Sequence, residues 1–88
     1  MYEIFLSKKA YKDRKLLKQA GLELKTKKLL NILSKDPFQT PPRYESLRGE
    51  LEGYYSRRIN IQHRLVYSVD IKKKIVYVYR MWTVMNYN

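Results

Sequence analysis

The chain has 88 residues, no cysteine and a formal net charge of +11, from 19 Lys and Arg against 8 Asp and Glu. This length leaves room for one small domain over residues 1–88, and 44% hydrophobic residues argue against disorder. No apolar run approaches the roughly 20 residues of a membrane span, and the N-terminus lacks the layout of a secretory signal. Without thiols there are neither disulfides nor thiolate metal sites, so a cytoplasmic location is the simplest expectation.

The first half of the chain predicts one strand and two helices. Residues 2–6 alternate as a short strand, and Ser7 is placed to cap a helix that ends before Gly21. Leucines at helical spacing over residues 22–35 predict a second helix, which ends before Pro37. Two helices joined at a glycine are typical of an antiparallel hairpin.

Beyond a proline-rich loop, the pattern changes to that of strands. Residues 44–49 predict a brief extended segment, and residues 54–61, 63–70 and 74–82 predict three consecutive strands with short connections. Short connections require antiparallel pairing. The predicted fold is therefore α+β, in the order β-α-α-β-β-β, with a helical hairpin packed on one side of a small twisted, mainly antiparallel sheet.

The excess of cations indicates a polyanionic partner. Nucleic acid, an anionic membrane and an acidic protein all fit the charge, and a merely solvated basic surface is the alternative. The membrane interpretation needs a broad apolar face on the first helix, and the stripe there is narrow.

Arginine is expected on the open face of the sheet. Leu65, Tyr67 and Val69 share one face of their strand, which is expected to pack against the helices, and Arg64 falls on the opposite face. Arg57 and Arg58 are neighbours on a strand and must point to opposite faces. One of these two can join Arg64, and the other is expected to be solvated or to contact a partner.

Other residues of these strands are expected to be structural. His63 lies on the opposite side of its strand from Arg64, which favours a half-buried structural histidine. Tyr77 and Tyr79 alternate as sheet residues do, and core packing is their expected role. Residues 72–74 are expected to form a solvated basic turn.

The sequence contains no Gly-rich phosphate loop, no metal-ligand spacing and no serine elbow, so we expect no metal and no cofactor. An arginine face beside the carboxylate of Glu45 suits metal-free cleavage of RNA. The carboxylate takes the 2′-hydroxyl proton, arginines offset the charge of the phosphorane, and an acid protonates the leaving 5′-oxygen. Tyr54, Tyr55 or Trp82 can stack on unpaired bases. The alternative is that Glu45 is only a surface carboxylate paired with Arg48.

The chain resembles, over essentially its whole length and most densely from Asp36 to Trp82, the YoeB/Txe branch of the RelE-like toxins of bacterial type II toxin–antitoxin systems. The resemblance rests on "DPF" at residues 36–38, "YESLRG" at 44–49, and "SRRI" at 56–59 followed by "HRLVY" at 63–67. It implies a RelE-like microbial RNase fold and a ribosome-dependent mRNA endoribonuclease that cleaves the A-site codon and inhibits translation.

The resemblance also implies roles for individual residues. The family's general base falls on Glu45, and its transition-state-stabilising arginine falls on Arg64. Its phosphate-binding basic residues fall on Arg48 and Arg58.

The C-terminal end departs from the family's pattern. Family members end in His-Tyr after the tryptophan segment, and that histidine acts as the general acid. Here Val84 and Met85 stand in those places, and neither donates a proton. Tyr87 is a poor substitute because a phenol is a weak acid. The expectation is an attenuated or inactive toxin, and the alternative is a non-catalytic module that binds RNA or the ribosome.

The implied partners are a cognate acidic antitoxin of the YefM/Axe type and the A site of the 70S ribosome with its mRNA. The antitoxin is expected to wrap a C-terminal segment over the toxin. Binding of operator DNA through the antitoxin and formation of a homodimer are left open by the sequence.

Overall fold

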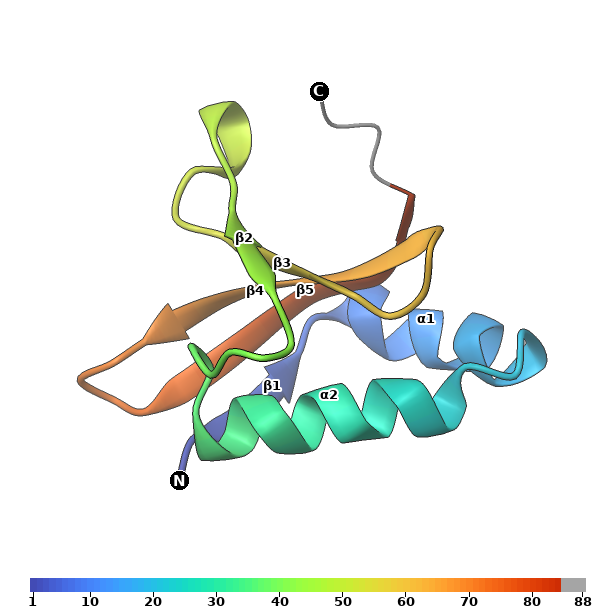
Figure 1. Ribbon diagram of the computed structural model, residues 1–88, viewed down its shortest axis with the longest axis horizontal. Helices are drawn as coiled ribbons and strands as arrows, with labels where there is room; N and C mark the ends of the chain where they lie inside the picture. Colours follow the sequence, from blue (N-terminus) through green and yellow to red (C-terminus); the bar gives the residue numbers. More distant parts are fainter. Residues whose placement is uncertain (85–88) are drawn as a thin grey trace.

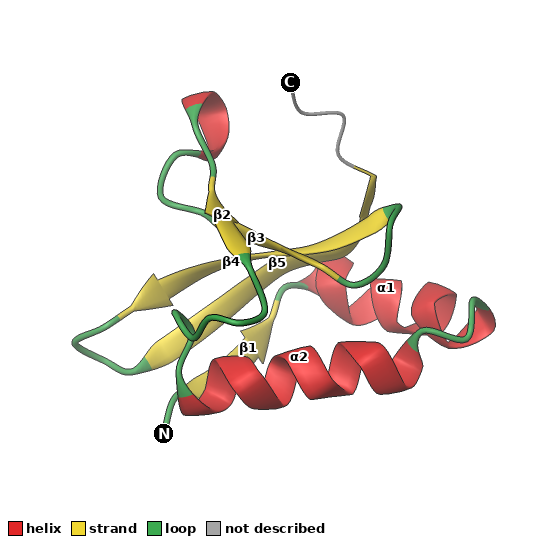
Figure 2. Ribbon diagram, in the orientation of Figure 1, coloured by secondary structure: helices red, strands yellow, loops and turns green. Residues whose placement is uncertain are grey.

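A computed structural model of the chain describes residues 1–84, without the side chain of Val84. In chain order the elements are β1 (Glu3–Leu6), α1 (Lys8–Gln19), α2 (Glu23–Lys35), β2 (Tyr44–Ser46), the 3-10 turn η1 (Gly49–Leu51), β3 (Tyr55–Arg58), β4 (His63–Asp70) and β5 (Ile75–Val84). Both helices lie on one side of a single twisted sheet (Figures 1 and 2). The predicted α+β architecture is confirmed.

The sheet has five strands in the order β1-β5-β4-β3-β2. The pairs β2–β3, β3–β4 and β4–β5 are antiparallel, as their short connections predict. β1 pairs in parallel with β5, with Glu3 opposite Ile75 and Leu6 opposite Val78. The first and last strands of the chain are therefore neighbours, and the helical hairpin follows β1 on one side of the sheet.

The helix ends lie where the sequence predicts them. The Ser7 hydroxyl accepts a hydrogen bond from the Ala10 N–H at 3.0 Å, which caps α1. Gly21 follows α1 with φ +72°, a conformation that glycine adopts without strain, and its N–H donates to the Lys18 carbonyl. Neither helix in the described part of the chain has the length and apolar character that a membrane span requires.

The core lies between the helices and the covered face of the sheet. Its buried residues are Ala10, Leu17, Leu22, Leu29, Leu33, Ile59, Leu65, Tyr67, Val76, Val78 and Met81. The expectation that Tyr77 and Tyr79 pack in the core is wrong, because both are exposed, at 42% and 39%. Helices cover only one face of β5 (Figure 1), and Val76 and Val78 occupy that face.

The ladder between β4 and β5 is irregular, and α1 stabilises it there. Register shifts fall on both sides of Val66, where β5 carries extra residues. Asp13 of α1 is 3% exposed and accepts hydrogen bonds from the Met81 N–H at 2.9 Å and the Arg80 Nε at 3.0 Å. The hydrogen bond to Asp13 raises the pKa of Arg80. A buried carboxylate thus binds a backbone donor at the bulge.

Arg57 corrects a second expectation, because it is neither solvated nor free to contact a partner. Its side chain is fully buried. Its guanidinium donates to the Pro42 carbonyl at 2.7 Å, the Gln39 carbonyl at 2.9 Å, the Pro37 carbonyl at 3.0 Å and the Tyr67 hydroxyl at 3.1 Å. Arg57 therefore ties the loop that precedes β2 to the sheet.

Two tyrosines complete the surroundings of this guanidinium. The Tyr44 ring lies 4.9 Å from the guanidinium carbon of Arg57. The Tyr67 hydroxyl donates to the Pro37 carbonyl at 2.8 Å, and burial raises the pKa of Tyr67. Together these contacts hold the proline-rich loop from both β3 and β4.

Replacing Arg57 should destabilise the fold far more than replacing its neighbour. Arg57→Met removes the guanidinium hydrogen bonds to the Pro37, Gln39 and Pro42 carbonyls, of which Pro37 keeps the Tyr67 hydroxyl as a donor. We expect a loss of about 3 kcal/mol in the free energy of unfolding. Arg58→Met, at an exposed position, should change it by no more than about 0.5 kcal/mol. Urea denaturation of both variants measures the difference. Similar losses in the two variants would show that the buried hydrogen bonds of Arg57 do not anchor the loop.

Candidate active site

A pocket of about 410 Å³ opens on the face of the sheet that the helices leave uncovered. It is lined by Pro42, Arg43, Glu45, Ser56, Arg58 and Arg64. These residues come from the end of the proline-rich loop and from β2, β3 and β4. The pocket, called the arginine pocket below, thus contains three of the five site residues predicted from the sequence.

The strand register brings these side chains together. Glu45 on β2 is opposite Ser56 on β3, and Arg58 on β3 is opposite Arg64 on β4. Ser56 and Arg58 are two residues apart on one strand and so share a face. Arg57 lies between them and points into the protein, as the alternation of a strand requires.

Arg64 connects the pocket's carboxylate and hydroxyl. Its NH1 lies 3.6 Å from the Glu45 Oε1 and donates to the Ser56 hydroxyl at 3.4 Å. The Arg64 side chain is 13% exposed and that of Glu45 is 37% exposed. Arg64 is therefore held by its neighbours, whereas the Glu45 carboxylate is accessible to a ligand.

This arrangement suits a phosphate diester with a hydroxyl next to it. Planar guanidinium groups donate paired hydrogen bonds to phosphate oxygens, and arginines from two strands point to one space. A carboxylate beside them can accept a proton from a hydroxyl group of the ligand. The alternative in which Glu45 is a surface carboxylate paired with Arg48 is not what the structure has, because the ion pair of Glu45 is with Arg64.

The two remaining predicted residues lie outside this pocket. Arg48 is exposed and precedes η1. Trp82 packs against the core and stacks on His63, with ring centroids 3.7 Å apart and an interplanar angle of 16°. The RNA contacts predicted for Arg48 and Trp82 stay predictions. His63 is buried at 8% exposure, in line with a structural histidine.

Arg43 and Ser56 line the pocket but were not predicted from the sequence. Arg43 is two residues before Glu45, so the alternation of an extended segment places both on one face. Ser56 is two residues before Arg58 in the same way. The predicted loss of the general acid rests on the side chain of Val84 and on residues 85–88. These lie outside the part of the chain that the structure describes.

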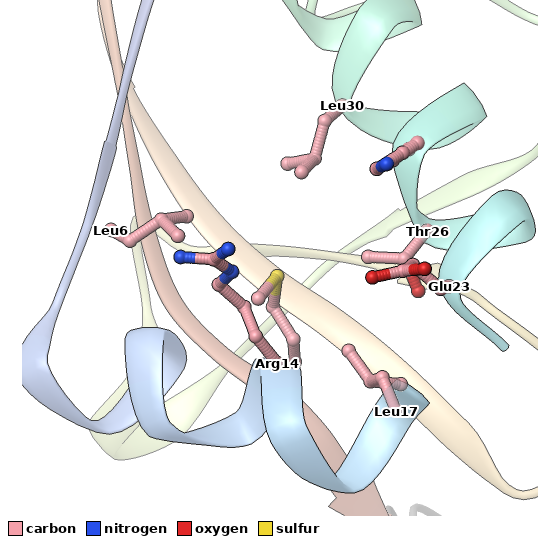
Figure 3. A pocket seen from close by; sticks show the side chains of 8 residues that line it. Leu6, Arg14, Leu17, Glu23, Thr26 and Leu30 are labelled. Atoms are coloured by element: carbon pink, nitrogen blue, oxygen red, sulfur yellow. The ribbon is translucent and has the colours of Figure 1, made fainter. Parts of the chain in front are cut away.

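A second, smaller pocket lies between the helices and the sheet (Figure 3). Its volume is about 170 Å³, and Leu6, Leu17 and Leu30 line it together with Arg14 and Glu23. Its charged side chains are Arg14, Lys27 and Glu23, so this mainly aliphatic lining lacks the three arginines of the arginine pocket. Within the part of the chain that the structure describes, no three His, Cys, Asp or Glu residues form a group that could hold a metal ion.

A family model described as the YoeB-like toxin of bacterial type II toxin–antitoxin system matches residues 6–82. The chain belongs to this family. It is 44% identical over 57 residues to Toxin YoeB of Synechocystis sp., an alignment that covers 65% of this chain and 59% of that protein. Among curated relatives in the family, the chain spans from 47% to 62% of their length.

Solved structures of the YoeB family have the same fold. The heterotetrameric YoeB–YefM toxin–antitoxin complex from Staphylococcus aureus contains a chain 31% identical to this one, with a TM-score of 0.79 and coverage of 97% of this chain and 99% of that chain. A YoeB dimer from the same organism gives a TM-score of 0.80 at 31% identity, covering 96% and 98% of the two chains.

The arginine pocket should bind a phosphate or sulfate ion, and Glu45 should oppose that binding. Removing the carboxylate's charge in Glu45→Gln should raise the affinity about two- to fivefold, the scale of a partly exposed ion pair. Arg64→Met should lower the affinity. NMR titration with inorganic phosphate at low salt measures both changes, and Glu52→Gln, at an exposed position outside the pocket, is the control. An affinity that Glu45→Gln lowers or leaves unchanged would contradict the shared pocket.

Proposed function

We propose that this chain is the toxin of a type II toxin–antitoxin module and acts as a metal-independent endoribonuclease on ribosome-bound mRNA. Membership in the YoeB-like family supports the role as a toxin. The observation that carries the proposed chemistry is the convergence of Glu45, Arg58 and Arg64 on one pocket.

In the proposed reaction, the Glu45 carboxylate accepts the proton of the ribose 2′-hydroxyl. The 2′-oxygen then attacks the adjacent phosphorus, which releases the 5′-oxygen and leaves a 2′,3′-cyclic phosphate. Arg58 and Arg64 donate hydrogen bonds to the phosphorane oxygens as negative charge builds on them. DNA lacks the 2′-hydroxyl and is therefore not a substrate.

The leaving 5′-oxygen needs a proton, and the family's histidine for this step is replaced by Val84 in this sequence. General acid catalysis usually contributes about 10²–10⁴-fold. We therefore propose that the chain is an attenuated nuclease. The altered tail also favours a second candidate, a module that binds RNA or the ribosome without cleaving.

The proposed partners follow from charge and from the solved relatives. The Staphylococcus aureus structures hold YoeB with YefM and YoeB as a dimer, which supports a YefM-like antitoxin and a homodimer for this chain. A net charge of +11 favours an antitoxin that is acidic where it covers the arginine pocket. The other proposed partners are the ribosome and its mRNA, in the cytoplasm. Any contact with operator DNA is proposed to occur only through the antitoxin.

Restoring the family's tail should raise cleavage. In a translation reaction with mapped mRNA ends, the double variant Val84→His with Met85→Tyr should cleave about 10²–10⁴-fold faster than the parent chain. The matched control, Val84→Asn with Met85→Tyr, gains a polar side chain without a usable acid and should show no such gain. Unchanged activity in the histidine variant would favour the non-catalytic module.

The same assay tests the pocket. Glu45→Gln in the histidine variant should lower cleavage about 10²–10⁴-fold, because the general base is lost. Lys72→Gln, in the distant turn between β4 and β5, is the control and should cleave normally. Cleavage that survives Glu45→Gln at full rate would contradict the proposed base.

A further inference from the structure

A second cleft on the open face of the sheet is aromatic. It has a volume of about 430 Å³ and is lined by Phe5, Leu6, Ser7, Tyr54, Ser68, Tyr77, Val78 and Tyr79. Phe5, Tyr77 and Tyr79 are 48%, 42% and 39% exposed. These rings take no part in the core, and the mechanism above does not use them. We call this region the aromatic cleft.

The rings form two pairs, which join β1, β5 and the residue that precedes β3. Phe5 of β1 stacks with Tyr77 of β5 at a centroid distance of 6.1 Å and an interplanar angle of 23°. Tyr54, just before β3, packs against Tyr79 of β5 at 5.6 Å. The parallel pairing of β1 with β5 places Phe5 opposite Tyr77, so the backbone register fixes this pair.

The aromatic cleft and the arginine pocket share one face of the sheet. Tyr54 precedes Ser56 by two residues and Arg58 by four, so alternation places all three on the same side. At about 3.3 Å per residue, Tyr54 lies about 13 Å along the strand from Arg58. Ser56, which lines the arginine pocket, is opposite Val66 on β4, so the pocket reaches to within two residues of Tyr54. A few consecutive nucleotides cover such a distance.

The lining of the aromatic cleft indicates a flat, uncharged ligand. Its lining contains no Asp, Glu, Lys, Arg or His side chain, whereas the arginine pocket carries three arginines and a glutamate. Tyrosine rings offer a π face for stacking and a hydroxyl that can bond the edge of a base, and Ser68 adds a second hydroxyl. An acidic peptide would gain more from the arginines than from these rings.

We propose that the aromatic cleft is a nucleobase-binding subsite that stacks an unpaired base of the RNA strand whose phosphate lies in the arginine pocket. This inference rests on the proposed function, because it assigns a second contact to the same RNA. Phosphate contacts position a strand whatever its bases are. Stacking on the rings adds binding free energy only where a base is present.

The experiment compares two short 2′-O-methyl RNA oligonucleotides, which cannot be cleaved, one carrying bases throughout and one abasic at two adjacent positions. Fluorescence anisotropy at low salt gives their affinities for the full chain. Tyr54→Leu and Tyr79→Leu keep apolar bulk but remove the planar ring. Each should weaken the base-containing oligonucleotide about 5- to 150-fold and leave the abasic one unchanged. Tyr54→Phe and Tyr79→Phe keep the ring and should bind nearly as the parent does.

Equal weakening of both oligonucleotides, or parental affinity in the leucine variants, would overturn the subsite. So would leucine variants that bind RNA normally but lose dimerisation or antitoxin binding, because the cleft would then be a protein-binding surface. The arginine pocket is tested separately by Arg58→Met and Arg64→Met, which should weaken both oligonucleotides. If the arginine variants bind RNA as tightly as the parent chain while the leucine variants bind it more weakly, the proposed function fails but the stacking subsite stands.

Discussion

The structure depends on a buried guanidinium. Arg57 has no exposed surface, and its described partners are three loop carbonyls and a phenol. Burying a cation is costly unless its donors are satisfied, and arginine brings five N–H groups in a fixed plane. The proline-rich loop supplies the acceptors and is held against the sheet in return. Because β2 follows this loop directly, Arg57 also fixes the position from which Glu45 enters the arginine pocket.

Two neighbouring arginines therefore have opposite functions. Arg57 stabilises the loop from inside, and Arg58 faces the pocket on the other side of the same strand. Arg64 on β4 joins Arg58 through the antiparallel register and contacts Glu45. The open face combines this charged region with the aromatic cleft, which supports the proposed contacts to a phosphate and to a base. Such a surface forms because the helical hairpin covers only one side of the sheet (Figure 2).

Periodicity and capping residues predicted most of the fold. Ser7 and Gly21 mark the ends of α1, and alternation in β4 is enough to place Arg64 and Leu65 on opposite faces of the sheet. The burial of Arg57 was not predictable, because its acceptors are backbone carbonyls of a loop without a regular pattern. Alternation separates the two faces of β5 but does not indicate which of them the helices cover. The core position predicted for Tyr77 was wrong for this reason. The pairing of β1 with β5 joins the two ends of the chain, and no local signal marks it.

The most direct measurement is a structure of the chain bound to a short RNA with a 2′-O-methyl group at the scissile position. The account predicts that oxygens of one phosphate lie within about 3 Å of the guanidinium nitrogens of Arg58 and Arg64, with the modified 2′-oxygen beside the Glu45 carboxylate. An RNA strand that binds elsewhere on the molecule, with these three side chains uncontacted, would contradict it.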